Sequence, residues 1–478
     1  MIPLSFAEIA AITGGRQHDI TDPEARITGP VVIDSREAGP GTLFAAFDGE
    51  HVDGHDFAEG AVASGAVAVL ATRPVGVPAI VVDDVTTALG ALARHSVHAL
   101  GTQVIALTGS SGKTSTKDLI AQLLERLGPT VWTPGSLNNE IGLPLTALRA
   151  DESTRHLVLE MGARGIGHIR YLTELTPPRI GVVLNVGTAH IGEFGGREQI
   201  AQAKGEMVET LPAARDGGVA VLNADDPNVR AMAARTSAAV LLFGEDPEAD
   251  VRAENVRLTE HGTPAFSLHT PTGCGDVTMR LYGEHHVSNA LAAAAVAHQL
   301  GMPAGDIAEA LSSAGTLSRW RMEVTERADG VTVVNDAYNA NPDSVRAALR
   351  ALSTMGEAAK ARGGRTWAVL GKMAELGDDT FAEHDAIGRL AVRLNVSKLV
   401  AVGGREAAWL DMGAKNEGSW GEESVHVSGA EAAVDLLRGE LRAGDVVLVK
   451  ASRSVGLEKV AAALLDESAN SGDGGAAR

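Results

Sequence analysis

"ALTGSSGKTST", residues 106–116, lies between an apolar stretch and an amphipathic one, and it decides how the middle of the chain folds. The apolar stretch 103–109 is typical of a buried strand, and 116–128 has the spacing of an amphipathic helix. The glycines therefore fall at a strand-to-helix turn. This is the position at which α/β proteins bind phosphate groups.

The loop has the form G-x-x-G-K-T, from Gly109 through Gly112 to Thr114. The longer form G-x-x-x-x-G-K-[ST] would require glycine where Leu107 stands. Backbone N–H groups and the helix dipole at this turn would face a phosphate, Lys113 would neutralise its oxygens, and the Thr114 hydroxyl could hold Mg²⁺. The alternative is a tight turn that binds nothing.

Outward from this loop, strands alternate with helices of about 10 to 15 residues, the pattern of a parallel sheet with right-handed crossovers. A β extension with antiparallel strands is expected at 250–283, and a second α/β series begins near 317. The predicted strands of the first series are 103–109, 155–162, 180–187 and 218–226, and the helices between them are 116–128, 167–175 and 197–211.

The predicted fold class is α/β with three domains. The first, 1–100, mixes turns with short strands; the second, 101–316, holds the phosphate loop; the third, 317–466, is Rossmann-like. The small polar residues of 467–478 predict a disordered tail. The predicted strands of the first domain are 31–37, 41–47 and 66–71.

Composition narrows the class of protein. The chain has 478 residues, 45% of them hydrophobic, and a formal net charge of −20, which argues against non-specific nucleic-acid binding. Cys274 is the only cysteine, so an intramolecular disulfide is impossible and a cysteine-based zinc site is disfavoured. No apolar run is long enough for a membrane span, and the N-terminus lacks the basic start of a signal peptide. A cytoplasmic protein, monomeric by default, is expected.

Polar side chains follow the other predicted strands at the edge where the phosphate loop lies. Glu160 ends the second strand, His190 follows the third, and "NADDP" (223–227) follows the fourth. A carboxylate and an imidazole beside a phosphate loop suit Mg²⁺ or Mn²⁺. Singly, Glu160 could be a solvated strand end, His190 a buried or capping histidine, and the aspartates a helix start. Lys204, taken alone, is expected to be a solvated helix-face lysine.

Together these motifs resemble the Mur ligase superfamily of ATP-dependent amide-forming enzymes, in which the shorter glycine loop is the usual form. The resemblance covers nearly the whole chain, and it departs from the common loop only in Ser111 and Ser115. It is carried by "TGSSGKTS" (108–115), "EMGA" (160–163), "NVGTAH" (185–190), "AKGE" (203–206), "NADDP" (223–227), "GEHHVSNALAA" (283–293) and "SRWRMEV" (318–324).

Longer motifs point to one branch of the superfamily. The stretch 34–57 resembles its uridine-nucleotide domain, 136–148 its substrate-contacting segment, and "AYNANPDS" (337–344) and "GKMAELG" (371–377) its C-terminal domain. This branch joins D-Ala-D-Ala to UDP-MurNAc-tripeptide. The resemblance implies that ATP phosphorylates the tripeptide carboxylate and that the D-Ala-D-Ala amine attacks the acyl phosphate. It implies an N-terminal domain that binds UDP-MurNAc, a central ATP-binding domain and a C-terminal ligase domain.

The resemblance also implies the site. Lys113, Lys204, His190 and Glu160 would be catalytic, with Thr114, Glu160, His190 and a carbamylated Lys204 as ligands of two Mg²⁺ ions, Mn²⁺ being possible. ATP would contact Thr108, Gly109, Ser110, Ser111, Gly112, Lys113, Thr114, Ser115, Asn289, Arg321 and Asp336. The substrates would contact Ser35, Arg36, Asp53, Gly54, His55, Asn138, Asn139, Asn339, Asn341, Glu375, Lys450 and Arg453. Either His285 or His286 could match the family's histidine, and Asp343 could cap a helix or bind a ligand.

Other functions remain open at this point. MurE, the sister ligase, would show a Tyr-Ala-His motif and an Asp-Asn-Pro-Arg motif, and neither occurs here. Folylpolyglutamate synthetase would lack the uridine-type block. A switch or motor ATPase would leave "NADDP" and "GKMAELG" unexplained, a non-catalytic module would not need Lys113 and Lys204, and a zinc-bearing amidating relative would need more cysteines. The third residue of the tripeptide, diaminopimelate or lysine, stays undecided.

Overall fold

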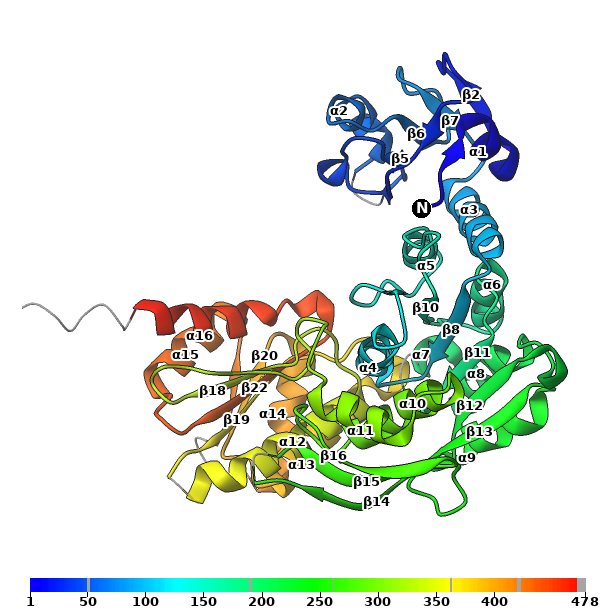
Figure 1. Ribbon diagram of the computed structural model, residues 1–478. Helices are drawn as coiled ribbons and strands as arrows, with labels where there is room; N and C mark the ends of the chain where they lie inside the picture. Colours follow the sequence, from blue (N-terminus) through cyan, green and yellow to red (C-terminus); the bar gives the residue numbers. More distant parts are fainter. Residues whose placement is uncertain (50–51, 189–190, 261, 362, 419–422, 471–478) are drawn as a thin grey trace, which may run out of the picture.

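The computed structural model describes residues 1–478 except 50–51, 189–190, 261, 362, 419–422 and 471–478. The described residues form three α/β blocks, which Figure 1 shows in blue, in cyan to green, and in yellow to red. This confirms the predicted three-domain α/β class. The N-terminal block stands away from the C-terminal one, and the central block touches both (Figure 1). No helix within the described ranges is long and apolar enough to cross a membrane.

The N-terminal block holds a five-stranded sheet of order β2-β7-β6-β5-β4, parallel except at β2, and a separate β1–β3 pair. Its elements are β1 (Leu4–Ser5), α1 (Phe6–Thr13), β2 (Arg16–His18), β3 (Arg26–Ile27), β4 (Val31–Val32), η1 (Ser35–Glu37), β5 (Leu43–Ala45), η2 (Gly54–Phe57), α2 (Ala58–Ala63), β6 (Ala68–Ala71) and β7 (Ala79–Val81).

The strand predicted for 31–37 is wrong beyond Val32. Asp34 Oδ1 accepts a hydrogen bond from the Arg36 backbone N–H at 2.9 Å, and its carboxylate pairs with the Arg36 guanidinium. Such a local side-chain-to-backbone bond favours a turn over an extended ladder. The chain therefore turns into η1 immediately after β4.

Helix α3 (Val85–Leu100) joins the first two blocks and was not expected among strands and turns. Its N-cap Asp84 accepts a hydrogen bond from Thr87 N at 2.7 Å, and Gly101 closes it at φ +60°. Both capping signals were readable in the sequence. The helix packs on α1 and on two helices of the central block, α5 (Gly142–Ala147) and α6 (His168–Leu175), so apolar packing continues across the boundary.

The central block is built on a nine-stranded sheet of order β16-β15-β14-β13-β12-β11-β8-β10-β9, parallel from β9 to β14 and antiparallel from β14 to β16. Four of the parallel strands and the antiparallel extension were predicted, whereas the parallel strands β9 and β13 were missed. The remaining elements are β8 (Gln103–Thr108), α4 (Lys113–Glu125), β9 (Thr130–Trp132), β10 (His156–Glu160), β11 (Ile180–Val183), α7 (Ile191–Phe194), α8 (Arg197–Glu209), η3 (Ala214–Asp216), β12 (Val219–Asn223), α9 (Pro227–Arg230), η4 (Ala231–Arg235), β13 (Ala239–Gly244), β14 (Val251–Leu258), β15 (Pro264–Thr270), β16 (Gly273–Thr278), α10 (His286–Gln299) and α11 (Ala304–Ser313).

The C-terminal block holds a six-stranded sheet of order β17-β18-β22-β19-β20-β21, parallel except at the β17 edge. Its elements are β17 (Glu323–Glu326), β18 (Thr332–Asn335), α12 (Pro342–Ala361), β19 (Thr366–Leu370), η5 (Gly377–Asp379), α13 (Thr380–Arg393), β20 (Lys398–Val402), α14 (Arg405–Glu417), β21 (Ser424–Val427), α15 (Ala430–Glu440), β22 (Val446–Lys450), η6 (Arg453–Val455) and α16 (Glu458–Asn470).

The disordered tail predicted for 467–478 begins too early, because α16 continues to Asn470. Val460 and Leu464 anchor this helix in the core of the block. Once a helix is nucleated, each further residue adds a hydrogen bond at little cost, so the polar residues after the anchor extend it. Residues 471–478 lie outside the described residues.

Candidate functional site

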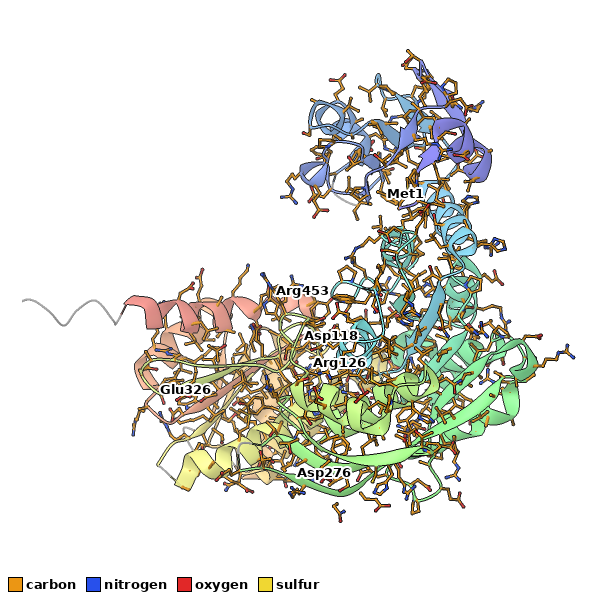
Figure 2. All side chains as sticks on the ribbon, in the orientation of Figure 1. Met1, Asp118, Arg126, Asp276, Glu326 and Arg453 are labelled. Carbon is orange, nitrogen blue, oxygen red and sulfur yellow. The ribbon has the colours of Figure 1, made fainter. Side chains whose placement is uncertain are left out.

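A cavity of about 530 Å³ lies where the phosphate loop of the central block meets the C-terminal block. Figure 2 labels Arg453, one of its lining residues, near the junction of the two blocks. The predicted site residues that line it are Gly109, Ser110, Gly112, Lys113, Thr114, Ser115, Asn138, Asn139, Glu160, Lys204, Arg321, Asn339, Asn341, Glu375 and Arg453.

The phosphate loop turns sharply because two conditions meet at Gly112. Its φ of +78° is the left-handed conformation that side chains disfavour, and α4 begins directly after it. A Cβ at this position would also lie 2.5 Å from Asn289 Oδ1. No side chain in the described part of the chain caps this helix start, so its first N–H groups remain available to an anion.

Replacing Gly112 with alanine is therefore expected to lower stability by about 1–2 kcal/mol through the left-handed backbone alone, and to weaken ATP binding further by displacing Asn289. The matched control is Gly101→Ala. Gly101 has a similar φ of +60°, but no described atom lies within 4 Å of the point where a Cβ would stand. Thermal unfolding and ATP titration of both variants separate strain from displacement. Equal ATP affinity in the two variants would contradict the role given to the Gly112–Asn289 contact.

Asn185 holds the loop from the neighbouring strand end. Its side-chain oxygen accepts hydrogen bonds from the backbone N–H groups of Ser110 and Ser111, each at 2.9 Å. Its amide donates back to the Ser111 carbonyl at 3.2 Å. Asn185 was not among the residues expected from the sequence, although its place directly after β11 in "LNVGTAH" was a usable signal.

Lys113 lies inside the cavity and donates a hydrogen bond to the Gly109 carbonyl at 2.8 Å. Burial lowers the pKa of Lys113, and the negative charge of Glu160 opposes this shift. The ammonium group therefore lies over the loop it follows, close to where a bound phosphate would place its oxygens.

Thr114 joins the two blocks. Its hydroxyl is 2.9 Å from Ser136 Oγ, and Arg321 Nη2 donates to Thr114 Oγ1 at 3.1 Å and to Ser136 Oγ at 3.2 Å. The Arg321 guanidinium also lies over the Tyr338 ring, 4.2 Å from its centroid, a cation–π arrangement. Ser136 and Tyr338 were not selected from the sequence, because only the fold brings them to the loop.

Glu160 supplies an unsatisfied carboxylate oxygen. Its side chain is 1% exposed; Oε1 accepts a hydrogen bond from Asn138 Nδ2 at 2.7 Å, whereas Oε2 is buried and has no hydrogen-bond partner among the described residues. A buried carboxylate oxygen left in this way is costly unless a cation or donor meets it. With the Thr114 hydroxyl in the same cavity, this donor set fits Mg²⁺.

His190, another of the predicted metal ligands, cannot be placed because it lies outside the described residues. Within those that are described, no group of three or more His, Cys, Asp and Glu side chains is arranged to hold a metal ion. The described donors for a cation in this cavity are therefore the Glu160 carboxylate and the Thr114 hydroxyl.

Lys204 faces the same cavity from α8 and is buried, so the expectation of a solvated helix-face lysine is wrong. Burial, reinforced by the positive charge of Lys113, holds the pKa of Lys204 well below its usual range. A lowered pKa favours the neutral amine, which is the form that reacts with CO₂.

The C-terminal block contributes polar groups to the opposite wall of the cavity. Asn341 Nδ2 lies 3.4 Å from the Ser110 carbonyl, and Glu375 adopts φ +63° in its loop. Arg453 lies over the Trp320 ring at 4.3 Å and pairs with Glu458 at 3.0 Å.

Two predicted contacts occupy a buried ion pair beside the cavity and do not line it. Lys450 Nζ donates to Asp336 Oδ2 at 2.6 Å and to the Asn339 carbonyl at 3.0 Å, while Asp336 Oδ1 accepts from the Met322 backbone N–H at 3.2 Å. Asp336 thus holds the residue that follows Arg321. Asp343 Oδ2 accepts from the backbone N–H of Thr188 at 3.0 Å, linking the two blocks.

The aspartates after the fourth strand have structural roles. Asp226 caps α9 and accepts the Val186 backbone N–H at 2.8 Å, and Asp225 accepts hydrogen bonds from the backbone N–H groups of Glu245 and Asp246. The helix-start alternative therefore describes Asp226, whereas Asp225 holds the turn at Glu245 and Asp246.

The remaining residues of the predicted nucleotide site surround the loop. Thr108 is buried at the end of β8, and Asn289 Oδ1 accepts from Thr116 Oγ1 at 3.2 Å. Burial lowers the pKa of His285 to about 4, with Asp336 opposing this shift. Burial, reinforced by the charge of His285, also holds the pKa of His286 well below its usual range. Neither nitrogen of His286 has a hydrogen-bond partner in the described part of the chain.

The predicted uridine-end residues belong to the N-terminal block and do not line this cavity. Asp53 caps η2, approaches His55 Nδ1 at 2.6 Å and accepts from Arg73 at 2.7 Å. Gly54 follows this cap, and a Cβ added at Gly54 would lie 2.6 Å from the Phe47 carbonyl oxygen. Ser35 and Arg36 lie in η1.

The chain matches three domain families in order: the "Mur ligase family, catalytic domain" over residues 29–97, the "Mur ligase middle domain" over 107–297, and the "Mur ligase, glutamate ligase domain" over 320–453. It is 51% identical to the UDP-N-acetylmuramoyl-tripeptide–D-alanyl-D-alanine ligase of Mycobacterium tuberculosis, over 97% of this chain and 98% of that one.

Two solved structures share this architecture. MurF from Acinetobacter baumannii has a TM-score of 0.85 at 33% identity and is matched over 99% of its length by 97% of this chain. The MurF ligase of Thermotoga maritima in complex with ADP has a TM-score of 0.77 at 31% identity, over 93% of this chain and 99% of that one. By matched domains, full-length identity and shared structure, the chain belongs to the Mur ligase family, in its MurF group.

Proposed function

We propose that this chain is an ATP-dependent, ADP-forming ligase that joins D-Ala-D-Ala to UDP-MurNAc-tripeptide, giving UDP-MurNAc-pentapeptide for peptidoglycan synthesis. The observation that carries this proposal is full-length identity of 51% to a relative of that name, in a chain whose phosphate loop, orphaned Glu160 oxygen and buried Lys204 meet in one cavity. A switch or motor ATPase would not need its phosphate loop to share one cavity with residues of a third domain.

The first step requires charge control at the phosphate loop. Members of this family use ATP with Mg²⁺, and the bound ion neutralises charge on phosphate oxygens. Thr114 and Glu160 would hold one ion, and the N–H groups after Gly112 would hold the phosphates. Lys113 would stabilise the γ-phosphoryl group as it passes to the tripeptide carboxylate.

The second step requires an amine and an acyl phosphate in a dry cavity. Attack by the D-Ala-D-Ala amine gives a tetrahedral intermediate, and phosphate leaves. Asn339, Asn341, Glu375 and Arg453 of the C-terminal block would orient the incoming dipeptide. The muramoyl tripeptide would contact Asn138 and Asn139, with its uridine end in the N-terminal block.

Lys204 would act as a carbamate. Its neutral amine would add CO₂ and release a proton, converting a cation beside Lys113 into an anionic oxygen ligand. This group and His190 would hold a second ion, Mg²⁺ or Mn²⁺, near the carboxylate being activated.

We assign residues 1–100, 101–316 and 317–466 as the UDP-MurNAc-binding, ATP-binding and ligase domains. We also assign action as a monomer, as expected from the sequence. ATP and UDP-MurNAc-tripeptide are both nucleotides, which supports action in the cytoplasm.

The test of the proposed function is phosphate release with ATP, Mg²⁺ and UDP-MurNAc-tripeptide, with and without D-Ala-D-Ala. We expect turnover to need both substrates and a UDP-MurNAc-pentapeptide mass to appear. Turnover with a single amino acid in place of the dipeptide would assign a sister ligase. ATP turnover without either substrate would instead support a switch or motor.

Changing Glu160 to glutamine is expected to raise the Mg²⁺ concentration needed for half-maximal activity by about 10- to 100-fold, because the orphaned anionic oxygen is lost. Glu140→Gln is the control, since Glu140 lies between β9 and α5 and its carboxylate is 3.3 Å from His168 Nε2, outside the proposed metal set. Mg²⁺ titrations of both variants check this. An unchanged Mg²⁺ requirement for Glu160→Gln would remove it from the metal site.

A further inference from the structure

A buried ion pair on α4 lies behind the phosphate loop and is not part of the cavity wall. Lys117 Nζ is 2.6 Å from Asp118 Oδ1, and both side chains are almost fully buried. Figure 2 shows Asp118 and Arg126 on α4 in the middle of the molecule. Buried charges of this kind are costly unless every group is paired, so their partners indicate what the pair does.

Lys117 holds the loop that follows β9. Its ammonium donates to the carbonyls of Thr133 at 2.8 Å and Gly135 at 3.2 Å. This loop continues into Ser136, whose hydroxyl contacts Thr114, and Asn138, whose amide contacts Glu160. One end of the pair is therefore fixed to the segment that touches both proposed ligands of the first metal ion.

Asp118 holds the linker that leads into the C-terminal block. Its carboxylate accepts hydrogen bonds from the backbone N–H of Ser318 at 3.0 Å and from the Ser318 hydroxyl at 3.1 Å. Lys117 Nζ also donates to Ser318 Oγ at 3.2 Å. Gln122, one turn further on, exchanges two hydrogen bonds with Gly315, each at 3.0 Å.

The linker reaches the cavity three residues after Ser318. Arg321 contacts Thr114 and Ser136 there, between Trp320 at φ +60° and Met322 at φ +48°. Left-handed backbone at non-glycine residues persists only where surrounding contacts enforce it. Asp118 fixes the chain at Ser318, just before this stretch, and Asp336 accepts the Met322 N–H on the other side.

We propose that Lys117, Asp118 and Ser318 are positioning residues for the nucleotide site, which act by holding Arg321 and the Ser136 loop against Thr114. The proposal rests on the proposed function, since it assigns Arg321 to ATP. Helix α4 thus carries the phosphate loop at its start and the contacts of Asp118 with Ser318 about one turn later.

A double-mutant cycle on ATP·Mg²⁺ binding tests this. Ser318→Ala removes the hydroxyl contacts and leaves the backbone bond, and it is expected to raise the ATP dissociation constant by about 5- to 20-fold. In an Arg321→Ala background the same change is expected to have less than about a twofold effect, because its target is gone. Asp118→Asn can take the place of Ser318→Ala in the cycle, and we expect the same changes in the ATP dissociation constant.

Arg126→Ala is the matched control. Arg126 lies on the same helix and bonds Glu309 and Ser313 just before the linker, but it touches neither Ser318 nor the Ser136 loop. Its ATP affinity is expected to match the wild type. Melting temperatures of all variants, measured alongside, show whether each one is folded.

Equal loss of ATP affinity from Ser318→Ala in both backgrounds would overturn the proposal, and so would no loss in the wild-type background. Failure of the proposed function is distinguishable. A wild-type protein that binds ATP but ligates nothing would disprove the ligase assignment while the cycle still reports on Arg321.

Discussion

Replacing Lys113 with methionine is expected to lower kcat for phosphate release by about a thousandfold, because the group that stabilises the transferring phosphoryl is lost. Methionine keeps an apolar stem of similar length in the same space, so the loop should retain its shape. Burial already disfavours the charged form of Lys113, so removing the charge should leave the melting temperature unchanged or raised. Single-turnover phosphate release and thermal unfolding check the two parts.

The charge-keeping variant Lys113→Arg separates charge from geometry. Arginine is too large for the short bond to the Gly109 carbonyl, so partial activity is expected with the affinity for ATP better retained than the rate. If Lys113→Met were to keep kcat within about tenfold of wild type, the phosphoryl-stabilising role would be wrong, since groups of this kind contribute at least that much.

Replacing Lys204 with alanine is expected to lower kcat by about a hundred- to a thousandfold, because the proposed carbamate ligand is lost. Lys204→Arg should be equally inactive, since arginine stays protonated and cannot add CO₂. If Lys204 carries a carbamate, Lys204→Ala and Lys204→Arg should both be inactive, although the first removes the charge and the second keeps a positive one. Gln202→Ala, an exposed change on the same helix, is expected to have wild-type activity.

Two measurements identify the carbamate itself. Growth or incubation with ¹³C-bicarbonate should give a carbamate carbon signal in wild type that is absent from Lys204→Arg. Short carboxylic acids such as acetate should restore part of the activity of Lys204→Ala, because they can fill the space with an anionic oxygen. A fully active Lys204→Arg would show that the positive amine, and not a carbamate, is what the site uses.

The pH dependence follows from the lowered pKa of Lys204. Neutral amine is the reactive form, and a pKa held below its usual range increases the fraction of that form at a given pH. CO₂ uptake should therefore persist near neutrality and fall as acid protonates the amine. Activity lost on brief acid treatment should return with bicarbonate.

The parallel core and one edge of the site were predictable because they depend on local patterns. Strands with apolar runs followed by helices dictate a parallel sheet, and in such a sheet the carboxyl ends of strands share an edge. That rule alone brings Glu160 to the glycine loop. The carboxyl end of the neighbouring strand also carries Asn185, which was overlooked because an amide beside a loop has many structural uses.

Lys204 shows where the pattern was insufficient. The spacing of α8 predicts a helix but not which neighbours cover it, and only the packing of α8 against the sheet makes this lysine buried. The same holds for Lys117, which follows Lys113 by one turn and is buried by the loop after β9 and by the linker.

Periodicity and contiguous motifs were enough to predict the phosphate loop, the family and the four strands β8, β10, β11 and β12, whereas the short strands β9 and β13 of the same sheet carry too little pattern and were missed. Only the tertiary structure decided that Arg321 reaches Thr114, that Asp336 pairs with Lys450, and that the uridine-end residues lie outside the cavity. Arg321 and Thr114 are 207 residues apart in the sequence, and Asp336 and Lys450 are 114 apart. Such contacts depend on how distant segments pack within and between domains, through packed surfaces and buried ion pairs that no local pattern records.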